Sequence, residues 1–207
     1  MRYAVSRHFY SQKPQYIEFI PTVKSNFLPM LKSELLQWQL NKTPLWNIPM
    51  RNFLLRHLVS SIEEPIFAVQ IPFHISSGNR TYIGKNFFAN YNCTIIDHAD
   101  VHIGNNVMIG PNVVITTASH PMTAQERIMT HSIRSFEIHK RAYTELCAPI
   151  TIGNNVWIAA GAIICPGVTI GDNAVIGAGS VVTRNVPANV FACGVPCRAI
   201  KNTDDIH

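Results

Sequence analysis

The chain has 207 residues, of which 47% are hydrophobic and only 14% charged. This composition excludes a disordered chain, and the length suits one domain with a small appendage. The formal net charge of +5 is spread along the sequence without a dense Lys/Arg run, which disfavours a nucleic-acid-binding protein.

Residues 1–65 show no repeat. Two segments, 27–40 and 50–60, have the leucine spacing of amphipathic helices. We expect residues 1–65 to form a helical N-terminal extension that caps the open end of the domain that follows.

Residues 66–207 contain a six-residue repeat. From Ile150 the sequence divides into ITIGNN, VWIAAG, AIICPG, VTIGDN, AVIGAG and SVVTRN, with an aliphatic residue every sixth position and a small residue after it. Three short sides then close one coil of about eighteen residues. The repeat predicts an all-β solenoid, a left-handed parallel β-helix. An ordinary β-sandwich gives no reason for strict sixes.

Two interruptions break the repeat. Ile103 follows Ile95 by eight residues, so two extra residues should bulge out around Asp97 and His98. Residues 117–149 lack the repeat altogether and should leave the solenoid as a protruding loop arm. Long loops within compact repeats are usually functional.

The segment from Asn79 to Ile200 resembles the galactoside and maltose O-acetyltransferases of the hexapeptide acyltransferase superfamily. The resemblance lies in YIGKNFFANYNCTIID, IGNNVMIGPNVVITTASHP, APITIGNNVWIAAGAIICPGVTIGDNAVIGAGSVVT and GVPCRAI. It implies an acetyl-CoA-dependent O-acetyltransferase that acts on a hydroxyl of a sugar or glycan. It also implies a homotrimer with active sites between subunits, and no metal requirement.

The resemblance assigns the catalytic base to His120, in the H-P dipeptide. A sugar hydroxyl is a poor nucleophile, and an imidazole can take its proton as it attacks the thioester. Asn90 matches the asparagine beside the reacting hydroxyl. Ser76, Phe88 and Asp97 would bind the acceptor. Where the family has two adjacent acids this chain has Asp97 and His98, and residues 1–65 hold no equivalent of the family's N-terminal Asp, so the sugar preference is not transferred.

The donor side matches more closely. The resemblance implies coenzyme A contacts from Trp157, the Ala160 backbone N–H, Ala178, Thr183, Arg184, Arg198 and Lys201. Arginine and lysine side chains suit the phosphates of coenzyme A. For Asp97 two roles stay open: a neighbour of His120 outside the coil face, or a cap that binds backbone N–H groups.

Three other functions stay open. An acetyltransferase that inactivates an antibiotic would share the donor site and the base. A γ-type zinc carbonic anhydrase would need three histidine ligands, for which His98, His102 and His120 are candidates. A scaffold without activity would keep only the solenoid.

Five irregularly spaced cysteines without a C-x-x-C pair predict reduced thiols. The N-terminus lacks a signal-peptide pattern, and no apolar stretch is long enough to span a bilayer. We therefore expect a cytoplasmic protein without a transmembrane segment.

Overall fold

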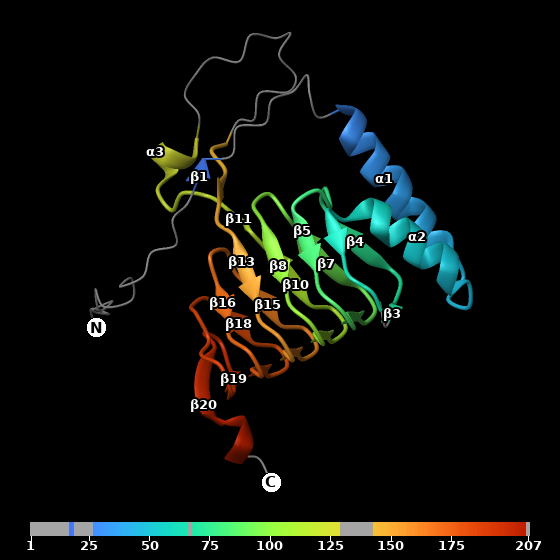
Figure 1. The fold of residues 1–207 in the computed structure, drawn as a ribbon. Helices are drawn as coiled ribbons and strands as arrows, with labels where there is room; N and C mark the ends of the chain where they lie inside the picture. Colours follow the sequence, from blue (N-terminus) through green and yellow to red (C-terminus); the bar gives the residue numbers. More distant parts are fainter. Residues whose placement is uncertain (1–16, 19–26, 66–67, 129–142, 206–207) are drawn as a thin grey trace.

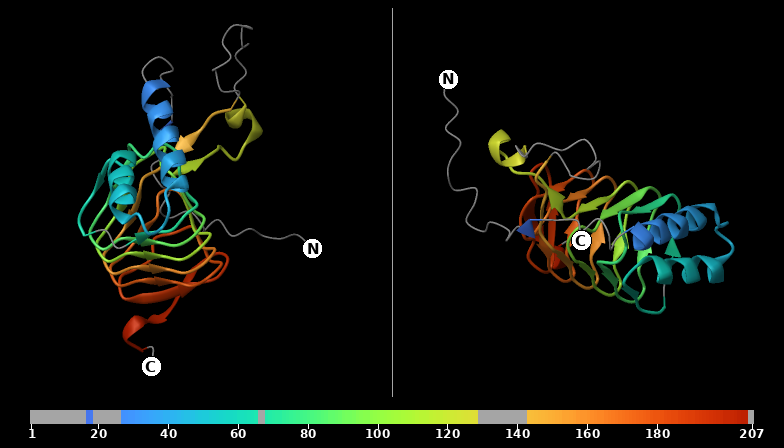
Figure 2. Two further views of the ribbon diagram at one scale, coloured as in Figure 1. Left: turned by 90° about the vertical axis from the view of Figure 1, so that its right-hand side faces the viewer. Right: turned by 90° about the horizontal axis from the view of Figure 1, so that it is seen from above.

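The structure is a computed structural model that describes residues 17–18, 27–65, 68–128 and 143–205. Its body is a β-helix with three parallel faces, and the predicted left-handed solenoid is confirmed. The stacked coils form a prism (Figure 1), whose outline is visible along its axis in Figure 2.

In each coil the chain passes from the first face to the second and then to the third. The first face consists of β2 (Ser61–Ile62), β5 (Thr81–Ile83), β8 (Val101–Ile103), β13 (Ile150–Ile152) and β16 (Thr169–Ile170). The second face consists of β3 (Ala68–Val69), β6 (Phe88–Ala89), β9 (Met108–Ile109), β14 (Trp157–Ile158), β17 (Val175–Ile176) and β19 (Val190–Cys193). The third face consists of β4 (Phe73–Ile75), β7 (Cys93–Ile96), β10 (Val114–Thr116), β15 (Ile163–Ile164) and β18 (Val181–Val182). We call the corners between them the first–second, second–third and third–first edges.

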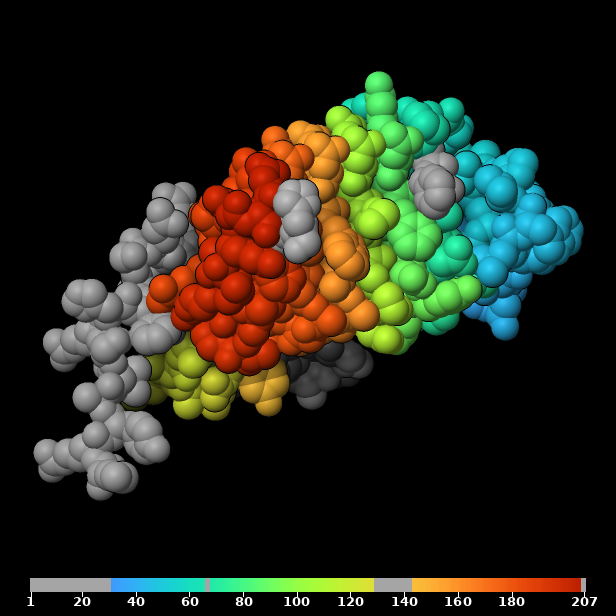
Figure 3. Space-filling model, turned by 90° about the horizontal axis from the view of Figure 1, so that it is seen from below, coloured from blue at the N-terminus to red at the C-terminus, as the bar shows by residue number. Residues whose placement is uncertain are grey.

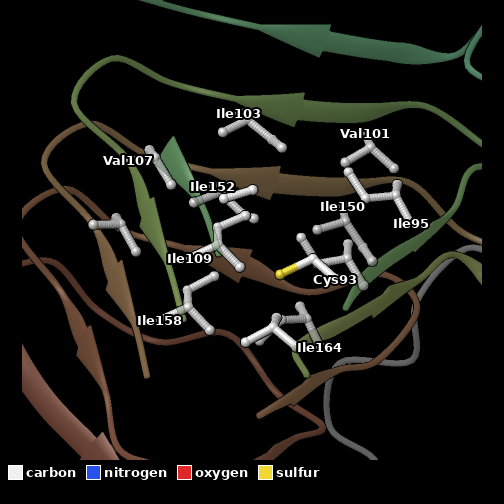
Figure 4. Packing of buried hydrophobic residues seen from close by; sticks show 14 of the residues in the cluster. Cys93, Ile95, Val101, Ile103, Val107, Ile109, Ile150, Ile152, Ile158 and Ile164 are labelled. Carbon is white, nitrogen blue, oxygen red and sulfur yellow. The ribbon is translucent and has the colours of Figure 1, made fainter. Parts of the chain in front are cut away.

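The aliphatic residues of the repeat fill the interior. Ile158, Ile164 and Ile170 are all 0% exposed, and Figure 4 shows such side chains meeting inside the coil. The small residue after each is required by close stacking at the corner. A Cβ on Gly104 would lie 2.7 Å from the carbonyl oxygen of Gly153 in the next coil. The repeat therefore predicted both the core and the corners correctly.

A ladder of asparagine side chains runs along the first–second edge. The side-chain amide of each asparagine donates to the side-chain oxygen of the next, over 2.7–2.9 Å. Its members are Asn86, Asn106, Asn155, Asn173 and Asn189. All have φ between 56° and 59°, a conformation that asparagine tolerates better than most residues.

The two-residue insertions of the solenoid and the arm lie on the third–first edge. The slip expected between Ile95 and Ile103 is present there, between β7 and β8. A second eight-residue step, from Ile75 to Ile83, lies directly beneath it. The arm leaves the next coil at the same edge, between β10 and β13. Three consecutive coils therefore carry their insertions one above the other.

The base of the arm is ordered. β11 (Ala118–Ser119) and β12 (Leu146–Cys147) pair antiparallel, and β1 (Ile17–Glu18) adds a third strand. One helical turn, α3 (Ala124–Arg127), stands off the stack of coils in Figure 1. Residues 129–142 of the arm lie outside the described residues, among them His131, Arg134, His139, Lys140 and Arg141.

Two helices cover the first coil, as Figure 2 shows: α1 (Phe27–Lys42) and α2 (Ile48–Leu58). The side chain of Asn41 donates to the carbonyl of Phe73 and accepts from its N–H, at 3.0 and 2.9 Å. The guanidinium of Arg51, whose pKa is lowered by burial, donates to the carbonyl of Val69. These side chains satisfy backbone groups that the first coil would otherwise leave unpaired.

The amphipathic pattern expected for the helices is only partly present. In α2, Leu54, Leu55 and Leu58 are buried. In α1, however, Leu31 and Leu35 are exposed, because polar side chains rather than leucines make much of its contact with β4. At the far end of the prism, β20 (Arg198–Asn202) folds back antiparallel on β19 and is followed by a 3₁₀ turn, Thr203–Asp205. Figure 3 shows the coils following one another between these two ends.

Candidate active site

The third–first edge brings together polar side chains from three insertions. Ser76 follows β4, His98 follows β7, and His120 follows β11 at the start of the arm. Glu145 lies opposite His120 where the register of β11 and β12 continues. Four groups capable of hydrogen bonding or proton transfer thus lie along one edge of the prism.

His120 is exposed, and its ring has a fixed orientation. Its Nδ1 lies 2.7 Å from the carbonyl oxygen of Thr144. A carbonyl can only accept, so Nδ1 carries the proton and donates it. In the neutral ring the lone pair is then on Nε2. This tautomer suits a general base, because Nε2 can take a proton from a bound hydroxyl.

Asp97 does not leave the coil face, and that expectation is wrong. Its side chain is buried, with the residue 1% exposed. The carboxylate accepts hydrogen bonds from the N–H groups of Ser77 and Arg80 and from the hydroxyls of Ser77 and Thr81, at 2.9–3.3 Å. The extra residues of the coil below supply these donors, and the carboxylate turns inward to meet them. These contacts support the capping role rather than contact with the acceptor.

Asn90 lies on a different edge from His120. It follows β6 at the second–third edge, where its side-chain oxygen accepts from the N–H of Tyr91 at 2.8 Å. The third face separates it from Ser76 and His120. One chain alone therefore does not bring Asn90 and His120 together.

The residues expected to bind the donor also divide between two edges. Ala160 and Ala178 stack at the second–third edge with Asn90, where Gly179 N–H donates to Ala160 carbonyl at 2.8 Å. Among the described residues, the Ala160 N–H donates to no backbone carbonyl. It is therefore available to donate a hydrogen bond to the carbonyl oxygen of a ligand. Thr183 and Arg184 lie at the third–first edge, after β18.

An apolar stripe crosses the outer surface of the second face. Trp157 is 47% and Met108 49% exposed, and Phe88 stacks next in the same register. Phe88 therefore lies on the second face, whereas Ser76 lies at the third–first edge. The two residues were expected to bind the acceptor together, but one chain does not bring them to the same place. Arg198 and Lys201 are exposed on β20, beyond the last coil of this face.

All five cysteines are free thiols, as expected. Over the ranges that the structure describes, no three His, Cys, Asp or Glu side chains are grouped closely enough to hold a metal ion. Within one chain, His98, His102 and His120 therefore do not form the ligand set that the zinc alternative needs. Among the described helices, none has the length and apolar character needed to traverse a bilayer.

Known proteins are similar to this chain in sequence and fold. Residues 149–184 match the family model described as bacterial transferase hexapeptide (six repeats). Galactoside O-acetyltransferase of Escherichia coli (strain K12) is 41% identical over 175 residues, which cover 84% of this chain and 79% of the relative. The chain belongs to the hexapeptide-repeat acetyltransferases.

Solved structures agree with this membership. A galactoside acetyltransferase in complex with coenzyme A superposes with a TM-score of 0.78 and 37% identity, over 91% of this chain and 87% of the other. A maltose O-acetyltransferase from Clostridium difficile 630 gives 0.74 and 40%, over 84% and 86%. The predicted family and enzyme class, an O-acetyltransferase, are confirmed.

Two residues of this acetyltransferase were missed by sequence reasoning. Thr144 acts through a backbone carbonyl, which leaves no side-chain signal. Glu145 was counted as part of the arm, although it is an acid placed shortly before the repeat resumes. Pairing the two ends of the arm as a hairpin would have set Glu145 opposite His120.

Proposed function

We propose that this acetyltransferase transfers the acetyl group of acetyl-CoA to a hydroxyl of a sugar or glycan, with His120 as general base. The hydrogen bond from His120 Nδ1 to the Thr144 carbonyl carries the proposal, because it leaves Nε2 as the basic atom on an exposed ring. The relatives named for galactosides and maltose support the acceptor class.

The reaction needs no covalent enzyme intermediate. Nε2 of His120 takes the proton of the acceptor hydroxyl as its oxygen attacks the thioester carbon. The carbonyl oxygen gains negative charge, for which the Ala160 N–H is a suitable donor. The carbon–sulfur bond then breaks, and the leaving thiolate takes a proton from the imidazolium. The products are an acetyl ester and free coenzyme A.

The site requires more than one copy of the chain. His120 and Ser76 lie on the third–first edge, whereas Asn90 and Ala160 lie on the second–third edge. If the third–first edge of one subunit faces the second–third edge of the next, each interface holds one complete set. Three such interfaces close a homotrimer with three sites. The exposed stripe with Trp157 and Met108 offers apolar surface for the donor or the neighbouring subunit.

The proposal is tested by an acceptor screen. The protein is mixed with acetyl-CoA and a methyl galactoside, maltose, oligosaccharides or antibiotics, and release of free thiol is followed. Acceptor-dependent thiol release with a sugar, together with an acetylated sugar in the mass spectrum, supports the proposal. Turnover of antibiotics alone would favour the antibiotic-inactivating alternative. Failure of every sugar tested would contradict the proposal.

A further inference from the structure

A second imidazole, His98, is hydrogen-bonded on both sides at the third–first edge. Its Nε2 lies 3.0 Å from the hydroxyl oxygen of Ser76. Its Nδ1 lies within hydrogen-bonding contact of the carboxylate of Glu145. The His98 side chain is 21% exposed and that of Glu145 only 8%. The mechanism above uses neither residue.

The Glu145 carboxylate determines which nitrogen of a neutral His98 carries the proton. An ionised carboxylate only accepts, so Nδ1 of His98 carries a proton and donates it to Glu145. In the neutral ring Nε2 is then an acceptor, and the Ser76 hydroxyl must donate to it. The oxygen of Ser76, which is exposed, is left with lone pairs and no proton to offer. It can accept a hydrogen bond from a ligand and cannot donate one.

The same two residues of the arm hold both imidazoles. The carbonyl of Thr144 fixes His120, and the side chain of the next residue, Glu145, fixes His98. The base and the Ser76 oxygen are therefore oriented from one short segment. A ligand hydroxyl that approaches His120 has the Ser76 oxygen on the same edge of the prism.

We propose that a neutral His98 and Glu145 are positioning residues that hold the Ser76 hydroxyl as an obligatory hydrogen-bond acceptor for a second hydroxyl of the acetyl acceptor. The inference rests on the proposed function for its substrate. It adds a selection rule: the acceptor carries, besides the reacting hydroxyl, another hydroxyl that donates to Ser76. A methyl ether at that second position can only accept, so it leaves the Ser76 oxygen without a donor.

A double-mutant cycle tests the chain of hydrogen bonds from Glu145 through His98 to Ser76, which we call the relay. Ser76→Ala, His98→Phe, Glu145→Gln and the double variant Ser76→Ala/His98→Phe are compared with the wild type, with whichever of methyl galactoside and maltose turns over in the screen. Ser76→Ala and His98→Phe should each raise the acceptor KM about tenfold, the value of one hydrogen bond, with the KM for acetyl-CoA unchanged. The double variant should be no worse than Ser76→Ala, because both changes remove one interaction. Multiplied effects would overturn the relay.

Singly O-methylated forms of that acceptor test the selection rule. One methyl ether should be a poor acceptor for the wild type and lose little further with Ser76→Ala. If every methyl ether loses the same additional factor with Ser76→Ala, no second hydroxyl donates to Ser76. His57→Phe is the matched control: His57 is an exposed histidine of α2 whose Nδ1 also bonds a carbonyl, and its loss should leave the acceptor KM unchanged.

A spectroscopic measurement keeps the relay testable without turnover. In ¹⁵N-labelled protein without acceptor, the imidazole signals assigned by His98→Phe should show Nδ1 protonated and Nε2 bare. Glu145→Gln, which keeps the side-chain shape, should shift the Nδ1 proton signal. A ring protonated at Nε2, alone or together with Nδ1, would overturn the relay. If His98→Phe folds poorly because it removes the partner of Glu145, the signal shift in Glu145→Gln assigns the His98 ring instead. Absence of sugar acetylation would contradict the proposed function and leave this measurement intact.

Discussion

The carbonyl of Thr144 selects the nitrogen of His120 that can act as a base. An exposed imidazole with two free nitrogens would spend part of its time in the wrong tautomer and the wrong rotamer. A hydrogen bond of 2.7 Å to a backbone oxygen removes both freedoms. The backbone of the arm does in this way what a carboxylate does in a Ser–His–Asp triad.

His120→Ala should lower the rate of acetyl transfer by about a hundredfold or more, the usual worth of a general base. The ring is exposed, so the melting temperature and the oligomeric state should stay close to those of the wild type. Steady-state thiol release and a thermal melt check both. Near-normal turnover in a folded variant would remove His120 from the mechanism.

The thiol of Cys93 should be almost inert. The side chain points into the coil, as Figure 4 shows, and burial raises its pKa to about 11. At pH 8 the thiolate fraction is then about a hundredfold below that of a thiol with the ordinary pKa of 9.0. Iodoacetamide with mass-spectrometric mapping should label the half-buried Cys165 and Cys193 well before Cys93. Labelling of Cys93 at the rate of a free thiol would show that the interior opens readily.

The same pKa shift has a consequence for stability. A folded pKa above the unfolded value means that the folded state holds its proton more tightly. Stability from Cys93 is therefore fully present below pH 9 and declines as pH rises toward about 11. Cys93→Ala should flatten that part of the stability profile.

At the scale of elements, insertions on neighbouring coils stabilise one another. The carboxylate of Asp97, in the second insertion, holds the N–H groups and hydroxyls of the first, from Ser77 to Thr81. Thr117, at the start of the arm, in turn accepts from the N–H of Ala99 at 2.9 Å. A fixed edge of this kind can hold Ser76 and His98 in place although both lie outside regular strands.

Asp97→Asn should destabilise the fold and leave the rate of acetyl transfer unchanged. The amide keeps one acceptor oxygen, but its NH₂ group places two donors against groups that also donate. We therefore expect the free energy of unfolding to fall by about 2–3 kcal/mol. A urea melt measures the loss, and kcat with the sugar acceptor should remain near that of the wild type.

Asp100→Asn is the control on the same edge. Its carboxylate lies 3.6 Å from Arg80 in a pair that is nearly half exposed, so its removal should change stability little. Lower kcat with full stability in Asp97→Asn would instead place Asp97 in the active site.

The repeat made the core predictable, because an inward aliphatic residue every six positions leaves few other folds. The slip at Ile95–Ile103 was visible for the same reason. The inward orientation of the Asp97 side chain was not predictable. It depends on hydrogen-bond donors one coil below, which the local sequence around Asp97 does not indicate. Glu145 and Thr144 were missed because the partners across the arm are defined by pairing over a long insertion. The resemblance supplied His120, and the contacts supplied its tautomer.

At the scale of the molecule, the proposed site needs one edge from each of two chains. Asn90 and His120 lie on opposite sides of the third face. A single prism would therefore have an incomplete site on each edge. Activity should be a property of the assembled oligomer.

Subunit mixing tests this directly. His120→Ala and Asn90→Ala, each nearly inactive alone, are mixed one to one, dissociated and reassembled. If each site takes His120 from one subunit and Asn90 from the next, about one quarter of the sites are intact by random assembly. Thiol release should recover to about that fraction of the wild-type rate. Mixing without dissociation is the control, and no recovery after proven exchange would place both residues in one chain's site.

The asparagine ladder limits how a solenoid of this kind can change in length. Outside the arm, bonded asparagines are 16–20 residues apart, and the rung from Asn106 to Asn155 closes across all 49 residues that include the arm. A short insertion at the first–second edge itself would displace one asparagine amide and break the two rungs that this asparagine makes. Loss of an entire coil would let its neighbours bond each other. Descendants of such a gene should therefore gain or lose whole coils, while new peptide enters at the corner where the arm already does, without breaking a rung.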